Sequence, residues 1–515
     1  MSLRILQKEK EKTRLRFREA HFSAPSGMLT SVFYSSIIDM VMLVDGEDTQ
    51  KPHVAVLSAP GMGHVTPLLE LAKRLVVDLG FQVSFLSITT DAPPAQLQLL
   101  NNNLTLPSDL HVIQLPHVDV STNDNVVVRI VHIVQESLRS LPSVLANLHS
   151  HKPVKALIVD PFCIEALETA DGYSIPTYLF LTASASYLAL ITYLPTLHAE
   201  VKGDYGKIKD RVLLPGCTPL WVDDLVPDLL IPEVLLLCNR IPLLKGVLVN
   251  TWEELEPVTL SALRNHPFFV NVPTPTVHPI GPLTKDKEGE VETELLTWLD
   301  KQPCDSVVYV SFGSGGTLSA EQTTELARGL ELSGKRFLWL ARRPKANDSS
   351  GSFFEAGCGD GALTASYLPD GFLERTQGAG LVTETWAPQV AVLSHPSVCG
   401  FVTHCGWNSV MESVVHGVAM VAWPLYVEQK MNARAFVEMG VAVWPEAGED
   451  GVVGRGEVER VVRMVVEGEE GKEIRRRVRE IQRSAVEALG GGGSSSGCLS
   501  RLGMEWRDGT HRSSS

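Results

Sequence analysis

Two polar residues at the ends of predicted strands could carry out proton transfer. His64 follows an apolar segment at residues 52–57 and the turn Gly61-Met-Gly, and Asp160 follows an apolar segment at 156–159. An imidazole with a reference pKa of about 6.5 suits general-base catalysis, and a carboxylate on its far nitrogen fixes the tautomer and stabilises the imidazolium. The alternative for His64 is a helix-capping or merely exposed histidine.

A second group of polar residues indicates a binding site for an anion. Residues 400–403 predict a strand, and a helix begins at Trp407 after a short turn. The free backbone N–H groups and the dipole of a helix N-terminus attract negative charge at the carboxyl end of a parallel strand. His404, Asn408 and Ser409 add side-chain donors there, so a diphosphate fits this segment best.

Plainer interpretations of the same residues stay open. Ser409 and Glu412 have the spacing of a capping box, which would explain both without any ligand. Trp386 and Trp407, taken singly, are more typical of a core than of a platform that stacks on a base.

Zinc is a further alternative for the cysteines and histidines of this region, which are Cys399, His404, Cys405 and His416. Adjacent residues at a strand end cannot both face one ion without distortion, and the spacing matches no structural zinc pattern. We therefore expect no metal site.

The elements that position these residues form two α/β halves. In the first half, strands are predicted at 52–57, 81–88 and 156–159, with a helix at 67–79. The pattern restarts with a strand at 306–312, the turn 313–316, and a helix at 319–332 that the pattern Ser319-x-x-Gln322 opens. Strand, glycine-rich turn and helix begin a doubly wound domain, so the fold class is α/β with two Rossmann-like domains facing across a cleft.

Composition sets the domain plan. We expect an extension at 1–50 that is disordered, a first Rossmann-like domain at 51–284, a linker at 285–295, a second Rossmann-like domain at 296–489 and a flexible tail at 490–515. The polar run at 285–290 marks the linker, and the glycines after Leu489 mark the tail.

Charge and cysteine content exclude several classes of protein. The chain has 515 residues, 44% hydrophobic and 20% charged, with a formal net charge of −15 and a pI of about 5.5. This negative net charge argues against non-specific electrostatic binding to nucleic acid or anionic lipid. Eight cysteines without a C-x-x-C pair favour reduced thiols. We expect a cytoplasmic monomer without a nucleic-acid partner.

No signal peptide or membrane span is predicted. Residues 1–20 hold seven Lys/Arg and three Glu without the apolar run of a secretory signal. The longest uncharged run, 173–197, contains Pro176, Pro195 and many hydroxyls, so it predicts a buried strand followed by a buried helix.

Residues 386–429 are the most specific stretch of the sequence. They include Trp386-Ala-Pro-Gln389, Gly400-Phe-Val-Thr-His404-Cys-Gly-Trp-Asn-Ser409 and Trp423-Pro-Leu-Tyr-Val-Glu-Gln429. This stretch resembles the plant secondary product glycosyltransferase box of UDP-sugar-dependent glycosyltransferases. The likeness extends over most of 52–489 and is strongest to the hydroquinone and monolignol glucosyltransferases. It implies a GT-B fold and a hexosyltransferase of plant secondary metabolism.

The resemblance assigns the donor site residue by residue. Uracil would stack on Trp386, with Ala387 and Gln389 at its edge, and Glu412 would bind the ribose hydroxyls. The remaining donor contacts fall into two sets. Ser314, His404, Asn408 and Ser409 would hold the diphosphate, and Trp407, Glu428 and Gln429 would hold the sugar hydroxyls. Thr182 would reach the donor from the other domain, so the resemblance makes 51–284 the acceptor-binding domain and 296–489 the UDP-sugar-binding domain.

The resemblance also implies the reaction. His64 and Asp160 match the family's catalytic dyad, and direct displacement by a phenolic or other hydroxylated acceptor would invert the anomeric centre of UDP-glucose. Gln429 is the family's usual mark for glucose, while Glu428 stands where Asp is common. No cofactor is implied and no metal is required, since UDP is stabilised by the helix and side chains and the sequence has no Asp-x-Asp.

The acceptor pocket is less well defined by the sequence. His64 and Val427 would face the acceptor, and the candidates beside them are 118–120, Phe162, Tyr187 and Leu188. Each of these is more typical of a core than of a pocket.

Two departures and two rival functions complete the interpretation. About 45 residues precede the usual start of the family, and the tail from Gly490 replaces the amphipathic helix with which such enzymes commonly end. A catalytically silent protein that binds a UDP-sugar or another small ligand is one alternative. An NAD-dependent dehydrogenase is weakened because Thr66 stands where a Rossmann fingerprint has its third glycine.

Overall fold

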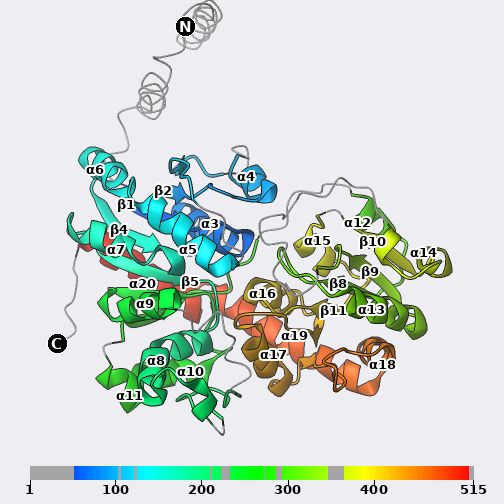
Figure 1. Ribbon diagram of the computed structural model, residues 1–515. Helices are drawn as coiled ribbons and strands as arrows, with labels where there is room; N and C mark the ends of the chain where they lie inside the picture. The colour runs from blue at the N-terminus through cyan, green and yellow to red at the C-terminus, as the bar shows by residue number, and fades with distance from the viewer. Residues whose placement is uncertain are drawn as a thin grey trace, which may run out of the picture. The chain divides into compact units, whose positions relative to one another are not determined.

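The computed structural model describes residues 51–101, 106–120, 125–208, 211–221, 232–272, 274–285, 293–345, 365–384 and 386–509. The predicted extension at 1–50 lies outside these residues. The described chain forms two lobes, each built on a parallel sheet with helices on both faces (Figure 1). The predicted fold class is thereby confirmed.

The first sheet has seven strands in the order β3-β2-β1-β4-β5-β6-β7, and every neighbouring pair is parallel. The strands are β1 (His53–Ser58), β2 (Gln82–Ser87), β3 (Leu110–Gln114), β4 (Val154–Val159), β5 (Thr177–Leu181), β6 (Gly246–Val249) and β7 (Thr276–Pro279). The strand order reverses between β1 and β4. Ligands bind at such a reversal, outside the carboxyl ends of the strands.

The second sheet repeats this plan with six parallel strands in the order β10-β9-β8-β11-β12-β13. Its strands are β8 (Val307–Ser311), β9 (Arg336–Leu340), β10 (Gly380–Thr383), β11 (Val398–Thr403), β12 (Ala419–Ala422) and β13 (Ala442–Val443). Here the order reverses between β8 and β11, so a second ligand-binding edge lies at the carboxyl ends of those strands.

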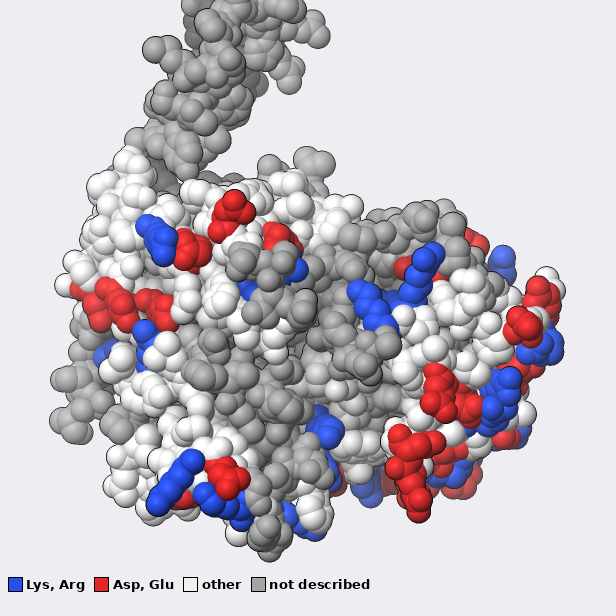
Figure 2. All heavy atoms as spheres, in the orientation of Figure 1, with Lys and Arg blue, Asp and Glu red and all other residues white. Residues whose placement is uncertain are grey.

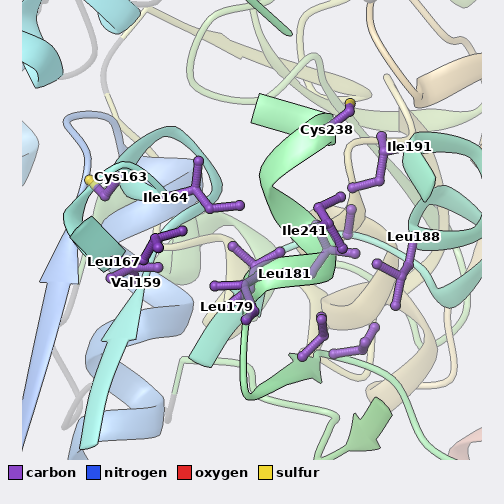
Figure 3. Packing of buried hydrophobic residues seen from close by; sticks show 14 of the residues in the cluster. Val159, Cys163, Ile164, Leu167, Leu179, Leu181, Leu188, Ile191, Cys238 and Ile241 are labelled. Atoms are coloured by element: carbon purple, nitrogen blue, oxygen red, sulfur yellow. The ribbon is translucent and has the colours of Figure 1, made fainter. Parts of the chain in front are cut away.

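Helices cover both faces of each sheet. In the first lobe they are α3 (Met62–Val77), α4 (Pro94–Asn101), α5 (Val126–Leu138), α6 (Leu141–His151), α7 (Ala166–Asp171), α8 (Ala185–Val201), α9 (Pro232–Arg240), α10 (Pro257–Asn265) and α11 (Pro267–Asn271). Alternate residues of β1 enter different clusters: Val54 and Val56 pack with α3, whereas Ala55 and Leu57 pack on the opposite face. The cluster on that opposite face includes Leu179 and Leu188 (Figure 3).

The helices of the second lobe are α12 (Glu294–Leu299), α13 (Ala320–Ser333), α14 (Phe372–Arg375), α15 (Gln389–Leu393), α16 (Trp407–Val415), α17 (Gln429–Glu438), α18 (Arg455–Glu467) and α19 (Glu469–Leu489). The capping box predicted for α13 is confirmed in part, since the backbone N–H of Gln322 donates to Ser319 Oγ at 3.1 Å. The predicted linker at 285–295 lies partly outside the described residues, and α12 already begins at Glu294.

The helix predicted at 67–79 begins five residues earlier than expected. Gly61 adopts a φ of 113°, and the backbone N–H groups of His64 and Val65 both donate to its carbonyl, so α3 starts at Met62. Proline is common at the first helical position, which is why the sequence predicts that this helix starts at Pro67. Pro67 instead lies inside the helix, which places His64 in the first turn of α3.

The flexible tail expected at 490–515 is wrong for most of its length. Residues Ser494–Asp508 form a helix, α20, whose apolar residues Cys498, Leu499, Leu502 and Trp506 belong to the core of the first lobe. The Trp506 ring lies 5.4 Å from that of Tyr178 and 6.0 Å from that of Phe81. The glycines that indicated a tail form only the turn before α20, where a Cβ on Gly493 would lie 2.1 Å from the carbonyl of Glu487.

The remaining expectations concern the membrane and the surface. The uncharged run at 173–197 contains β5 and most of α8, which confirms the buried strand and helix. None of the described helices is both long and apolar enough to cross a bilayer. On the face in Figure 2, acidic and basic side chains are interspersed over the second lobe. In α19, ion pairs such as Arg476–Glu473 and Lys472–Glu469 join charges of opposite sign.

Candidate active site

The carboxyl ends of both sheets open into one cavity of about 750 Å³. Its walls include His64 after β1, Thr182 after β5, Ser314 after β8 and His404 after β11. The two strand reversals therefore face the same space. A volume of this size is typical of a small-molecule site.

The first lobe contributes a histidine and a carboxylate in direct contact. Nδ1 of His64 lies 2.6 Å from Oδ2 of Asp160, and the side chain of Asp160 is fully buried. The other carboxylate oxygen accepts the backbone N–H of Phe162 at 3.0 Å and so caps the 3-10 turn Pro161–Cys163. Because Nδ1 is taken, Nε2 is the ring nitrogen of His64 that is left for a ligand in the cavity.

Carboxylates make His64 a stronger base than an ordinary histidine. Burial lowers its pKa, but the charge of Asp160, the hydrogen bond that the ring donates to Asp160 and the charge of Glu428 raise it, and the net direction is upward. The ring of Phe162, 5.3 Å from that of His64, covers one side of the pair. The arrangement suits a base that accepts a proton and is stabilised once charged.

The second lobe contributes a helix N-terminus with side-chain donors. α16 begins at Trp407 with no side-chain cap, so the N–H groups of its first turn lack an intrahelical partner. His404 lies beside it, close to two glycines: a Cβ on Gly313 or on Gly406 would lie 2.4 Å from its ring. The backbone makes a tight turn between His404 and Gly406, since Cys405 adopts a left-handed conformation with a φ of 62°.

His404 is held neutral, in contrast to His64. Burial, together with the nearby charge of Arg342, lowers its pKa to about 3. Its Nδ1 is buried without a hydrogen-bond partner among the described residues. A neutral ring with an unpaired nitrogen can donate one hydrogen bond to a bound oxygen without carrying a charge of its own.

Gln389 joins the residues assigned to the nucleoside. Its Nε2 donates to Glu412 Oε2 at 2.7 Å and to Ser409 Oγ at 2.9 Å. The capping-box alternative is therefore wrong, because Ser409 lies inside α16 and caps nothing. Burial raises the pKa of Glu412 to about 7, with the hydrogen bond from Gln389 opposing that rise. Trp386, beside it, is 43% exposed and lines the cavity together with Ala387.

Trp407 does not present its indole to a ligand. The side chain is buried, and Nε1 donates to the backbone carbonyl of Asn250 in the first lobe at 2.8 Å. The expected contact between the Trp407 side chain and the sugar hydroxyls is therefore not supported, and only its backbone N–H remains for that role. The core interpretation of this tryptophan is the better one.

The remaining donor residues lie at the cavity wall. Ser314 follows β8, and its carbonyl accepts from Nη1 of Arg342 at 2.5 Å. Oε1 of Gln429 accepts the backbone N–H groups of Leu425 and Tyr426, which leaves the amide nitrogen of Gln429 to act as a donor.

The acceptor candidates divide into two groups. Phe162, Tyr187 and Val427 line the cavity, and Val427 has a φ of 52°, which is strained for a β-branched residue. Leu188 is fully buried in the core, and 118–120 lie outside the lining, so these expectations are wrong. Leu188 directly follows the cavity residue Tyr187 on α8. Successive residues of a helix face different directions, so Leu188 faces the core.

Sequence reasoning missed most of the apolar lining. This lining comes from α5, α8 and the segment around α9. Its members include Val126, Ile130, Ile191, Leu237, Cys238 and Ile241. Three of its residues, Ile191, Cys238 and Ile241, also belong to the buried cluster drawn in Figure 3. The signal that could have revealed this lining is the apolar face of α5, which is wider than packing against the core requires.

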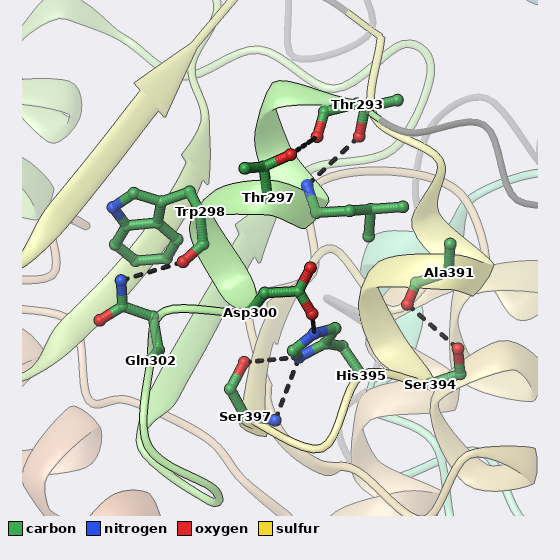
Figure 4. Close-up of polar contacts among 10 residues, drawn as sticks. Thr293, Thr297, Trp298, Asp300, Gln302, Ala391, Ser394, His395 and Ser397 are labelled. Carbon is green, nitrogen blue, oxygen red and sulfur yellow. Dashed lines mark hydrogen bonds and ion pairs between the residues drawn. The ribbon is translucent and has the colours of Figure 1, made fainter.

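Two other features of residues 386–429 are structural. His395 contacts Asp300 through Nε2 at 3.1 Å and Ser397 Oγ through Nδ1 at 2.8 Å, and so joins α12 to the end of α15 (Figure 4). The thiols of Cys399 and Cys405 donate to backbone carbonyls, and the described residues contain no group of three potential ligands for a metal. These contacts leave the zinc interpretation without support.

Two facing Rossmann-like lobes with a shared cavity define the GT-B class of glycosyltransferase fold. Residues 262–483 match the family model described as UDP-glucoronosyl and UDP-glucosyl transferase. Anthocyanidin 3-O-glucosyltransferase 5 of Manihot esculenta is 44% identical over 88% of this chain and 96% of its own length. Hydroquinone glucosyltransferase of Rauvolfia serpentina is 40% identical over 89% of this chain and 98% of its own.

Solved structures agree with this match. TcCGT1 in complex with UDP has a TM-score of 0.83 at 41% identity and covers 89% of this chain and 99% of its own. Phytolacca americana UGT2 with UDP-2fluoro-glucose and pterostilbene has a TM-score of 0.78 at 39% identity, covering 88% and 99%. The chain belongs to the UDP-glycosyltransferase family, and the dehydrogenase alternative is wrong.

Proposed function

We propose that this protein is an inverting O-glucosyltransferase that transfers glucose from UDP-glucose to small phenolic acceptors. The observation that carries the proposal is the His64–Asp160 pair, which faces the N-terminus of α16 across one cavity. A base on one side and an anion site on the other are the two requirements of this transfer.

His64 acts on the acceptor. Its Nε2 takes the proton of the acceptor hydroxyl as the hydroxyl oxygen bonds to the anomeric carbon and the bond from that carbon to the diphosphate oxygen breaks. A phenol with a pKa of about 10 is poorly ionised at neutral pH, so proton removal assists the attack. Asp160 stabilises the imidazolium that forms, because its carboxylate accepts the hydrogen bond from Nδ1.

The second lobe acts on the leaving group. Negative charge develops on UDP, and the first-turn N–H groups of α16 with Ser314, His404, Asn408 and Ser409 are placed to stabilise it. Trp386, Ala387, Gln389 and Glu412 hold the uridine in this proposal.

Glucose and a phenolic acceptor are the proposed substrates. Glu428, Gln429 and Thr182 line the cavity where the sugar would lie, and the backbone N–H of Trp407 joins them. Support for both substrates comes from relatives whose names are glucosyltransferases of hydroquinone and of anthocyanidin. The apolar lining around Ile130 and Ile191 suits a flat, weakly polar acceptor.

We further propose a monomer acting in the cytoplasm. The cysteines of the described residues are all free, which agrees with a reducing compartment.

The test is product formation from UDP-glucose with hydroquinone or coniferyl alcohol, followed by mass spectrometry and by the anomeric coupling in NMR. We expect a β-glucoside, and a lower rate with UDP-galactose as the matched donor. An α-glucoside would contradict the inverting mechanism. UDP binding by calorimetry with no product over a broad acceptor panel would favour the silent-binding alternative.

A further inference from the structure

One hydrogen bond joins the proposed donor site directly to the residue before the proposed base. Nδ2 of Asn408, in the first turn of α16, donates to the backbone carbonyl of Gly63 at 2.9 Å. Gly63 precedes His64 in the first turn of α3. The two residues are 345 positions apart and belong to different lobes.

The carbonyl of Gly63 is available because of a proline. In a regular helix this carbonyl would accept the N–H of the residue four positions later, which here is Pro67. Proline has no N–H, so Gly63 loses its intrahelical donor. A proline inside a helix is unfavourable by itself, and alanine would suit the helix better.

Asn408 can serve both lobes at once. A carboxamide carries two N–H donors, and the bond to Gly63 uses one of them. The second remains for the diphosphate that the proposed function assigns to this residue. The carbonyl oxygen of Asn408 is buried without a partner among the described residues, so the amide is held through its nitrogen.

We propose that Pro67 is a positioning residue: it frees the Gly63 carbonyl for Asn408 and thereby ties the placement of His64 to the helix that binds the donor. This inference rests on the proposed function, since it takes the roles of His64 and Asn408 from there. A donor held by Asn408 then fixes the first turn of α3, and with it the base, relative to the anomeric carbon.

The test is Pro67→Ala, which supplies the missing N–H, with Pro195→Ala as the matched control. Pro195 also lies inside a helix, α8, but Pro67 lines the cavity and Pro195 does not, so this control tests the loss of a helix proline alone. We expect Pro67→Ala to lower kcat about 3- to 10-fold, the value of one neutral hydrogen bond, with UDP affinity changed less than about twofold and Tm not lowered. Pro195→Ala should keep the wild-type kcat.

A double-mutant comparison separates positioning from packing. Adding Pro67→Ala to Asn408→Ala should cost less than about twofold in kcat, because the bond is already absent. Pro67→Ser, which supplies the same N–H on another side chain, should match Pro67→Ala. A wild-type kcat in Pro67→Ala, or an equal loss in both backgrounds, would overturn the proposal.

Hydrogen exchange distinguishes this inference from the proposed function. If the wild type forms no glucoside, the proposed function fails, and the exchange of the first-turn amides of α3 still reports the link. UDP should slow their exchange in the wild type and not in Pro67→Ala, while α16 is protected in both. Equal protection of α3 in the two proteins would contradict the link.

Discussion

His64 and His404 lie at the strand reversals of the two sheets, after β1 and after β11, and have opposite proton affinities. Each follows a strand at the reversal of its sheet, and each lines the same cavity. Yet the pKa of His64 is raised, while burial and Arg342 lower the pKa of His404 to about 3. Burial lowers the pKa of both rings, and their charged neighbours make the difference, since Asp160 and Glu428 raise the pKa of His64 whereas Arg342 lowers that of His404.

The comparison shows how one architecture supports two chemical roles. A strand followed by a turn and a helix places an imidazole at the cavity in both lobes, and the adjacent charges decide whether it acts as a base or as a neutral donor. A protonated His404 would bind UDP more tightly but would hold the product as well. A neutral His404 stabilises the leaving group only through its hydrogen bond.

The largest expected effect separates the two histidines by kinetics. His64→Ala should lower kcat about 10²- to 10⁴-fold, the range of a general base, with little change in UDP affinity. His404→Ala should mainly raise the KM for UDP-glucose, about 10-fold, because one donor to the diphosphate is lost. The measurement is steady-state kinetics with both substrates varied.

Matched controls are His64→Gln and His404→Gln, which keep a polar side chain. If His64→Ala retained the wild-type kcat, or if His404→Ala abolished catalysis while UDP bound normally, the assignment of roles would be reversed.

A smaller effect is expected from removing the carboxylate that distinguishes the two rings. Asp160→Asn keeps the shape of the side chain but removes the charge that raises the pKa of His64. Since the base must be neutral to act, the acid limb of the rate profile should move to lower pH, while the maximal rate falls roughly 10²-fold. The pH dependence of kcat/KM for the acceptor checks both shifts. A limb that stays in place would mean that another group sets it.

The smallest effect concerns a carboxylate of the second lobe. Glu412, with a pKa of about 7, must lose its proton to accept the ribose hydroxyls, so UDP should bind more tightly as the pH rises from about 6 to about 8. Glu412→Gln should bind UDP roughly 10-fold more weakly at the upper pH and should lose this rise. Calorimetry across that range measures it, and an unchanged slope in the variant would assign the titration to UDP itself.

The sequence predicted the two sheets and most of the cavity lining at the strand ends. The apolar strands before His64, Asp160 and His404 were recognisable because parallel strands are buried on both faces. The cavity that these residues share follows from the order of the strands in each sheet, and local sequence patterns carry no information on that order.

Other features depended on contacts between distant segments. The helix that contains His64 was predicted to start too late because Pro67 is tolerated inside α3. The Gly63 carbonyl, which Pro67 leaves without an intrahelical donor, accepts a hydrogen bond from Asn408. α20 was missed because its glycines and serines have low helix propensity, and only burial of Trp506 in the first lobe stabilises it. The indole of Trp407 turns away from the cavity for an equally distant reason, its bond to Asn250.

The most direct test of the comparison is an NMR titration of isotope-labelled histidine side chains, with the two resonances assigned through His64→Gln and His404→Gln. The account predicts that the pKa of His64 lies above the ordinary histidine value of about 6.5 and that His404 stays neutral throughout the range in which the protein is folded, with a pKa of about 3. A His404 that titrates at or above His64 would contradict the central claim.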